Sequence, residues 1–181
     1  MVSKLRKKNK LHGGIIMDNF EELLVAPASD VLHKVSVAAM WIFAVVAFFY
    51  MALGAFVYTL IFGAAAIALF FAKKYSYVEY EYSNTNGEIE IDSIFEQKNR
   101  KRKITFDMKD VLLMAPVESD RYKDNKENVS KVINTVPRGN TDKKYSAIVS
   151  KGAVKVEILM VLTQEFIDSC YIYNPRTVVK Y

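Results

Sequence analysis

The sequence has very few residues of the kinds that build catalytic and metal centres. Cys170 is the single cysteine, and both histidines, His12 and His33, come before residue 34. No internal disulfide can form, and the rest of the chain cannot supply a Ser-His-Asp, a Cys-His or a His-containing zinc site. We therefore expect no catalytic residue, no metal and no cofactor, and we expect Cys170 to act as a small buried apolar residue.

Glycine is also scarce, and the seven glycines never take the spacing of a phosphate-binding loop. Glu88 and Glu90 could form a carboxylate pair for acid–base work. Their alternation with Ile89 and Ile91 is, however, typical of the solvent-facing side of a strand. An enzyme would need a site made from Asp, Glu, Lys, Tyr and Ser alone, so we expect a non-enzymatic protein with no small-molecule substrate.

Charge is missing from one long stretch, residues 35–72, which holds 38 residues without Asp, Glu, Lys or Arg. As one helix it would measure about 57 Å, nearly twice the thickness of the hydrocarbon core of a bilayer. Two helices at about 35–52 and 55–72, joined by a turn at Gly54, fit that thickness. The stretch therefore predicts a transmembrane hairpin that makes the protein an integral part of the lipid bilayer.

Basic residues flank this hairpin on one side only. Lys34 precedes it, Lys73 and Lys74 follow it, and the central turn has no charge. The positive-inside rule then predicts a multi-pass cell-membrane protein with both termini in the cytoplasm. A secretory signal and a buried helix pair of a soluble protein are the alternatives, but the apolar run starts too late and is too long for them.

The net charge of +5 is concentrated near the hairpin. Eight basic and four acidic residues precede residue 75, whereas seventeen basic and sixteen acidic residues follow, so +4 of the charge lies in the first part. Nucleic acid is therefore not the expected partner.

The segment before the hairpin divides into two parts. Residues 1–16 are basic and predict a disordered tail, unless translation begins at Met17. Within 17–34, the spacing of Phe20, Leu23 and Leu24 is typical of a short amphipathic helix at the membrane interface. Packing of this segment against the cytoplasmic domain is an equally open interpretation.

Residues 75–181 change to a period of two, which predicts a β-rich cytoplasmic domain. Asn86–Gly87 is a strong hairpin-turn signal between two alternating segments. A helical turn capped by Asp107, a strand over 111–114 and a polar loop over 118–144 follow. Two more strands, joined at Lys151–Gly152, precede a final helix that Thr163 caps, with an inner face formed by Phe166, Ile167, Cys170 and Tyr171. The fold class is thus α+β, with six or seven antiparallel strands and a C-terminal helix.

Four stretches carry a resemblance to a known family: MDNFEELLV, YVEYEYSNTNGEIEIDSIF, RKRKITFDMKDVLLMAP and YNPRTVVKY. Over residues 17–181 the chain resembles an uncharacterised family of small bacterial membrane proteins. That family has a two-helix transmembrane hairpin followed by a bacterial pleckstrin-homology-like (PH-like) domain. The resemblance implies a bent, seven-stranded antiparallel barrel closed at one end by the last helix, and it implies no activity.

One basic run in the β domain is a candidate binding patch, which we expect to lie on a turn between strands. It contains Lys98, Arg100, Lys101, Arg102 and Lys103. The run could contact anionic lipid, or it could be a solvated turn whose charge nearby acids offset. It lacks the interleaved aromatic residues that nucleic-acid binding would favour.

The sequence therefore predicts a membrane-anchored, non-enzymatic interaction module of the PH-like type. A protein or peptide partner, not identifiable from the sequence, would bind an exposed strand edge or the 118–144 loop. The alternative function is that of an anionic-lipid or envelope sensor that contacts headgroups through the basic run.

Overall fold

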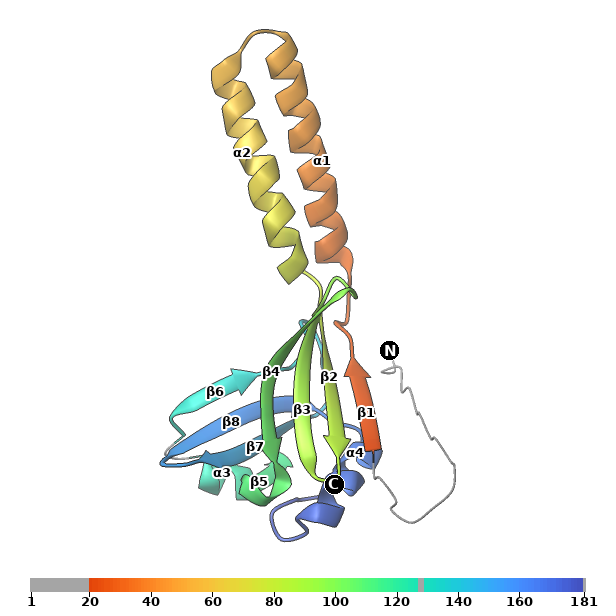
Figure 1. Ribbon diagram of the computed structural model, residues 1–181, viewed down its shortest axis with the longest axis vertical. Helices are drawn as coiled ribbons and strands as arrows, with labels where there is room; N and C mark the ends of the chain where they lie inside the picture. Colours follow the sequence, from red (N-terminus) through yellow and green to blue (C-terminus); the bar gives the residue numbers. More distant parts are fainter. Residues whose placement is uncertain (1–19, 127–128, 181) are drawn as a thin grey trace.

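A pair of long helices stands on a β-rich domain in the computed structural model, which describes residues 20–126 and 129–180 (Figure 1). The helices are α1 (Val31–Ala52), α2 (Phe56–Ala72), α3 (Asp120–Asn125) and α4 (Gln164–Tyr173), with short 3-10 turns η1 (Lys73–Tyr75) and η2 (Met108–Asp110). The strands are β1 (Phe20–Val25), β2 (Val78–Thr85), β3 (Glu88–Phe95), β4 (Asn99–Asp107), β5 (Val111–Pro116), β6 (Lys131–Asn134), β7 (Lys144–Lys151) and β8 (Val154–Val161).

The two long helices run antiparallel and contact each other along their length (Figure 1). Their bounds agree with the predicted 35–52 and 55–72, except that α1 begins four residues earlier. Gly54 forms the turn with a φ of +72°, a conformation that costs glycine little. Beside the turn, the rings of Tyr50 and Tyr58 stack with centroids 5.1 Å apart. We call this unit the helical pair.

The first sheet has the strand order β1-β2-β3-β4, and we call it sheet A. Its first strand corrects our prediction of an amphipathic helix within 17–34, because residues 20–25 pair antiparallel with β2 from Phe20↔Thr85 to Val25↔Tyr80. Leu23 and Val25 are buried, at 1% and 2% exposed. The alternative interpretation, packing against the domain, describes this segment. The predicted tail at 1–16 lies outside the described residues.

This pairing also corrects the predicted domain boundary at residue 75. The β domain is discontinuous, because β1 lies before the helical pair and β2 follows it. Only residues 26–30 and 73–77 connect the two strands to the helices. The helical pair is thus an insertion into the connection between two neighbouring strands.

The second sheet, sheet B, has the order β5-β7-β8-β6. β6 pairs with β8 in parallel, from Lys131↔Val156 to Asn134↔Leu159, so the sheet is not purely antiparallel as predicted. The predicted loop over 118–144 is also wrong in part, because it contains α3 and β6. The side chain of Ser119 caps α3 by accepting a hydrogen bond from the backbone N–H of Tyr122.

The strands of sheet B cross those of sheet A at a steep angle, with the core between the two sheets (Figure 1). The described residues form two four-stranded sheets and not a closed barrel, which corrects the barrel that we predicted. The local predictions for this part are confirmed. Asn86 and Gly87 take φ values of +54° and +90° in the β2–β3 turn, and the Asp107 side chain accepts a hydrogen bond from the N–H of Lys109 at 2.8 Å.

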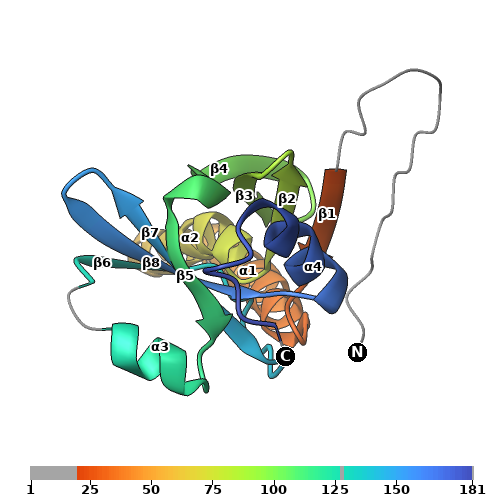
Figure 2. The same cartoon turned by 90° about the horizontal axis from the view of Figure 1, so that it is seen from below.

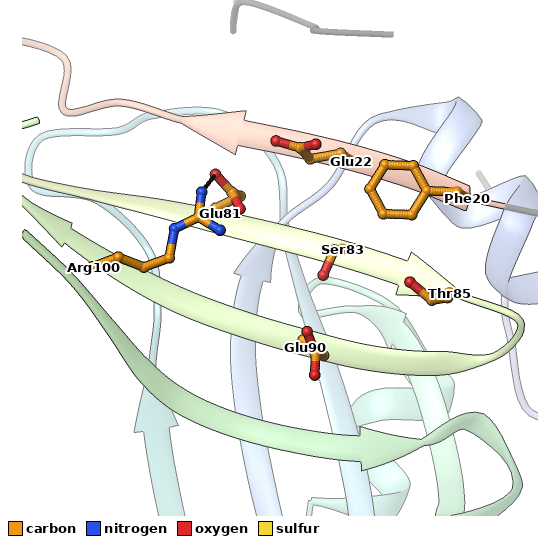
Figure 3. Close-up of a pocket in the computed structure, with 7 residues that line it drawn as sticks. All are labelled: Phe20, Glu22, Glu81, Ser83, Thr85, Glu90 and Arg100. Carbon is orange, nitrogen blue, oxygen red and sulfur yellow. Dashed lines mark hydrogen bonds and ion pairs between the residues drawn. The ribbon is translucent and has the colours of Figure 1, made fainter. Parts of the chain in front are cut away.

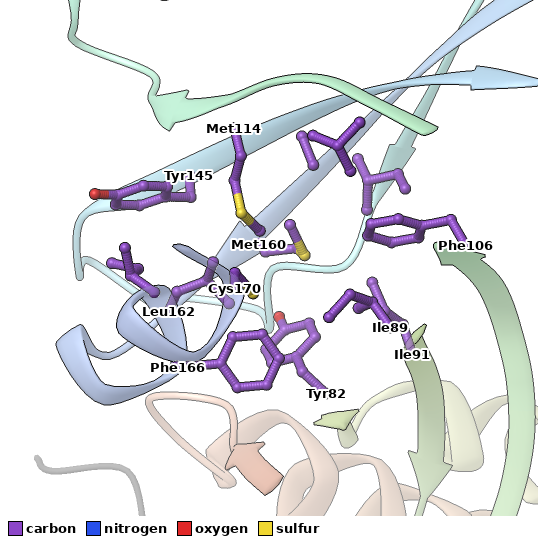
Figure 4. Packing of buried hydrophobic residues seen from close by; sticks show 14 of the residues in the cluster. Tyr82, Ile89, Ile91, Phe106, Met114, Tyr145, Met160, Leu162, Phe166 and Cys170 are labelled. Atoms are coloured by element: carbon purple, nitrogen blue, oxygen red, sulfur yellow. The ribbon is translucent and has the colours of Figure 1, made fainter. Parts of the chain in front are cut away.

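The core joins both sheets to α4 (Figure 4). Tyr82 of β2 is fully buried, and its hydroxyl donates to the carbonyl of Thr135 at 2.7 Å. The ring of Phe166 lies 6.3 Å from that of Tyr82, and burial raises the pKa of the Cys170 thiol to about 12. Cys170 is therefore a buried core residue, as predicted.

Helix α4 crosses the end of the domain that faces away from the helical pair (Figure 2). Thr163 accepts a hydrogen bond from the N–H of Phe166 and caps the helix, as predicted. Tyr171 departs from the prediction. It is exposed, and the ammonium of Lys180 lies 4.1 Å from its ring centroid, whereas Tyr173 packs partly against the core.

Because β1 and β2 are neighbours, a short turn should be able to replace the helical pair. We expect a chain in which a four-residue turn containing Asn-Gly replaces residues 26–79 to be soluble and folded, with a cooperative thermal transition by circular dichroism. A fragment starting at residue 75 should lack this transition, because it loses the buried Leu23 and Val25 and exposes an edge of β2. Cooperative folding of the fragment alone would contradict the structural role of β1.

Candidate functional site

Charged side chains gather on the outer face of sheet A, the face that points away from the core. Antiparallel pairing puts directly opposed residues on the same face, so the register Glu22↔Ser83↔Glu90 forms one cross-strand row there. A groove of about 380 Å³ follows this face (Figure 3). Its lining residues are Phe20, Glu22, Glu81, Ser83, Thr85, Glu90 and Arg100.

Two residues of the predicted basic patch complete this face. We predicted a turn for this run, but residues 99–103 form the first half of β4. Arg100 lies over the groove and donates to the carboxylate of Glu81, with Nη2 and Oε2 2.6 Å apart (Figure 3). Arg102 donates to the carboxylates of Asp92 and Glu90. The two arginines therefore balance part of the acidic charge of their own sheet.

The three lysines of the patch differ from the arginines. Lys98, Lys101 and Lys103 are exposed, and none of them forms an ion pair with any other residue in the described ranges. Lys103 is the extra residue where the β3–β4 register shifts, since Ile91 faces Ile104 while Asp92 faces Arg102. The patch thus consists of paired arginines and free lysines.

Burial sets the electrostatics of Glu81. Its side chain is only 10% exposed, and loss of hydration raises the pKa of its carboxyl, while the charge of Arg100 acts in the opposite direction. Its neighbour Glu79 is also buried, and its carboxylate accepts a hydrogen bond from the hydroxyl of Tyr77 at 3.0 Å. These contacts fix the carboxylates in place on the sheet.

A second polar cluster lies under α3, on the outer face of sheet B. The buried carboxylate of Glu157 accepts hydrogen bonds from the hydroxyls of Tyr122 and Ser146 at 2.7 and 2.8 Å. Burial and the bond to Glu157 raise the pKa of Tyr122 to about 12. Because these donors and the acceptor satisfy one another, the cluster attaches α3 to the sheet.

The predicted membrane-flanking lysines lie together at the end of the helical pair nearest the domain, which we call its foot. The ammonium of Lys34 is 2.9 Å from the carboxylate of Asp30, and that of Lys73 is 3.8 Å from Glu96. Lys74 instead lies over the ring of Tyr75, 4.9 Å from its centroid. His33 reaches the carbonyl of Lys73 with Nδ1 at 3.3 Å, which joins the first turn of α1 to the linker after α2.

Comparison with known families identifies the fold. The family model described as Bacterial PH-like domain (DUF6106) matches residues 17–180. The chain belongs to this family. No curated protein and no solved structure matches it. The match includes both β1 and the helical pair, so the helical insertion lies within the matched PH-like region.

The PH-like domain presents little that resembles a metal centre. In residues 20–126 and 129–180, no three His, Cys, Asp or Glu side chains form a group that could hold a metal ion. Sequence reasoning missed the pairing of Glu81 and Asp92 with the arginines. Part of the signal was present, because the Asn86–Gly87 turn sets the β2–β3 register and puts Glu81 opposite Asp92, whereas the place of the arginines depends on the β3–β4 register.

The raised pKa of Glu81 leads to a pH-dependent prediction. The folded protein favours the protonated carboxyl of Glu81, so protonation stabilises the fold. As the pH falls from the raised pKa of the folded state towards the ordinary pKa of the unfolded state, wild type should gain stability relative to Glu81→Gln. Chemical unfolding in detergent at neutral and mildly acidic pH measures this difference. Glu88→Gln, at an exposed position on the same face, is the control. A wild-type advantage that shrinks on acidification would contradict the assignment.

Proposed function

We propose that the protein is an integral membrane protein whose helical pair crosses the bilayer twice and holds the PH-like domain at the cytoplasmic face. There the domain acts as a non-enzymatic interaction module. The observation that carries the proposal is the insertion of two long, apolar helices between neighbouring strands of one sheet.

The helical pair has the surface that a bilayer favours. With 22 and 17 residues, the helices extend about 33 Å and 26 Å, close to the thickness of the hydrocarbon core. Large apolar side chains along both helices are more than half exposed, among them Trp41 and Phe48 on α1 and Leu60 and Phe71 on α2. In water such a surface would be costly, whereas lipid tails would cover it.

Orientation follows from the charges and from the insertion. Both linkers enter the same sheet, so the segments before α1 and after α2 lie on one side of the membrane. Lys34, Lys73 and Lys74 lie on that side, and the positive-inside rule then favours the cytoplasm for both termini.

The edges of the two sheets suggest where a protein partner would bind. Lysines and a β-bulge at β4 are features that protect an edge from pairing. Residues 177–179 cover part of the edge of β5, because Met114 exchanges backbone hydrogen bonds with Thr177 and Val179 at 2.9 and 2.8 Å. β1 carries acidic side chains and contacts α4.

β6 forms the other edge of sheet B. Within the described residues, no strand pairs with its outer side, and Val132 is 56% exposed there. β6 also belongs to the 118–144 segment. The two partner sites expected from the sequence, an exposed strand edge and this segment, therefore coincide at β6. We infer that an extended segment of a protein partner adds to sheet B along β6.

The topology can be tested with single introduced cysteines, because the native Cys170 is fully buried. Leu53→Cys, at the helical turn, should react with a membrane-impermeant maleimide on intact cells. Ala153→Cys, in the β7–β8 turn, should react only after the membrane is permeabilised. Labelling of Ala153→Cys on intact cells would refute a cytoplasmic domain.

The partner edge can be tested by photo-crosslinking in native membranes. A photoreactive phenylalanine analogue at Val132 should give a discrete adduct, because β6 would lie against the partner. The same analogue at Ile172, which is 63% exposed on α4, is the matched control. Equal adducts at both positions, or none at Val132, would argue against the β6 edge.

A further inference from the structure

The foot of the helical pair brings together three segments that are far apart in the sequence. One is the end of α2 with η1, the second is the β3–β4 turn, and the third is the connection between β6 and β7. Figure 1 shows the near ends of β3 and β4 beside the foot. Because the linkers are short, this end of the domain has to lie next to whatever surrounds the helices.

Contacts hold the β3–β4 turn at the foot. The rings of Phe95 and Tyr75 meet edge to face, 5.8 Å apart, and Glu96 forms the ion pair with Lys73. The N–H of Glu96 also donates to the carbonyl of Tyr77 at 3.2 Å. Lys98 closes the turn by donating its N–H to the carbonyl of Phe95 at 3.0 Å. This bond fixes the backbone of Lys98 at the foot.

A separate contact attaches the β6–β7 connection to the other linker. The N–H of Ala28 donates to the carbonyl of Arg138 at 3.2 Å. A Cβ placed on Gly139 would lie 3.4 Å from the Cβ of Ala28, which shows that the two segments pack closely. The backbone of Arg138 therefore lies beside the first linker, and its side chain is exposed.

The cations at the foot divide into two groups. Asp30 neutralises Lys34 and Glu96 neutralises Lys73. Lys74, Lys98 and Arg138 form no ion pair with the residues that the structure describes. One unneutralised cation therefore comes from each of the three segments, and Lys74 lies over the ring of Tyr75, which is 64% exposed.

We propose that Lys74, Lys98 and Arg138 form a headgroup-binding surface around the foot and contact the phosphate groups of anionic phospholipids. The proposal rests on the bilayer-spanning helices of the proposed function, which put this surface at headgroup depth. Each cation near an anionic surface strengthens the contact, and Tyr75 and Phe95 suit the interfacial layer. Of the basic run, Lys98 takes this role and the paired Arg100 and Arg102 do not.

The test compares lipid retention in full-length protein reconstituted into nanodiscs of phosphatidylcholine with a minor share of phosphatidylglycerol. Native mass spectrometry counts the two lipids that stay bound to the released protein. Wild type should retain phosphatidylglycerol in excess of its share. The double variant Lys98→Gln/Arg138→Gln should lower this enrichment by roughly threefold. Lys74 stays unchanged, because it also contributes to orientation.

The matched control is Arg176→Gln, which removes an exposed arginine with no ion pair among the described residues. It follows α4 at the opposite end of the domain, beyond Asn174, whose amide donates to the carbonyl of Met108 at 2.8 Å. Equal enrichment in wild type and the double variant, or an equal loss in Arg176→Gln, would overturn the headgroup surface and leave the spanning helices intact. Protein that fails to enter nanodiscs would overturn both proposals.

Discussion

The pairing of β1 with β2 is the constraint from which the rest of this architecture follows. Six residue pairs, from Phe20↔Thr85 to Val25↔Tyr80, join segments that the whole helical pair separates along the chain. Both linkers must therefore return to neighbouring positions at one end of sheet A. The helices can only run out and back, and their common foot lies directly beside the domain.

The same constraint shapes the two charged surfaces. On the outer face of sheet A, the register of β2 to β4 aligns Glu81, Glu90 and Asp92 with Arg100 and Arg102, so these three carboxylates have a partner within the sheet. At the foot, Lys34 and Lys73 have acidic partners as well. Lys74, Lys98 and Arg138, which come from the segments around the foot, have no acidic partner among the described residues. This division of paired and unpaired charge is what makes the foot a more attractive binding surface than the groove.

Features that depend on local sequence were predictable. The uncharged run, Gly54, the Asn86–Gly87 turn and the Thr163 cap each depend on a few neighbouring residues. β1 was not predictable in this way, because Phe20, Leu23 and Leu24 fit a helical period and the strand partner lies more than fifty residues away. β6 has only four residues in a polar segment, and its parallel pairing with β8 decides its conformation. The ion pairs of Arg100 and Arg102 could not be predicted either, because they depend on the register between β3 and β4. The number of basic residues in the run does not determine that register.

The discontinuous domain also has a consequence for biosynthesis. β1 leaves the ribosome first, but its partner Tyr80 is made only after the 54 residues from 26 to 79. If the helical pair spans the bilayer as proposed, the growing chain presents two apolar helices to the insertion machinery during that interval, while Leu23 and Val25 have no sheet to join. In that arrangement, membrane integration precedes completion of sheet A, and the first strand pairs only when the second strand has been made.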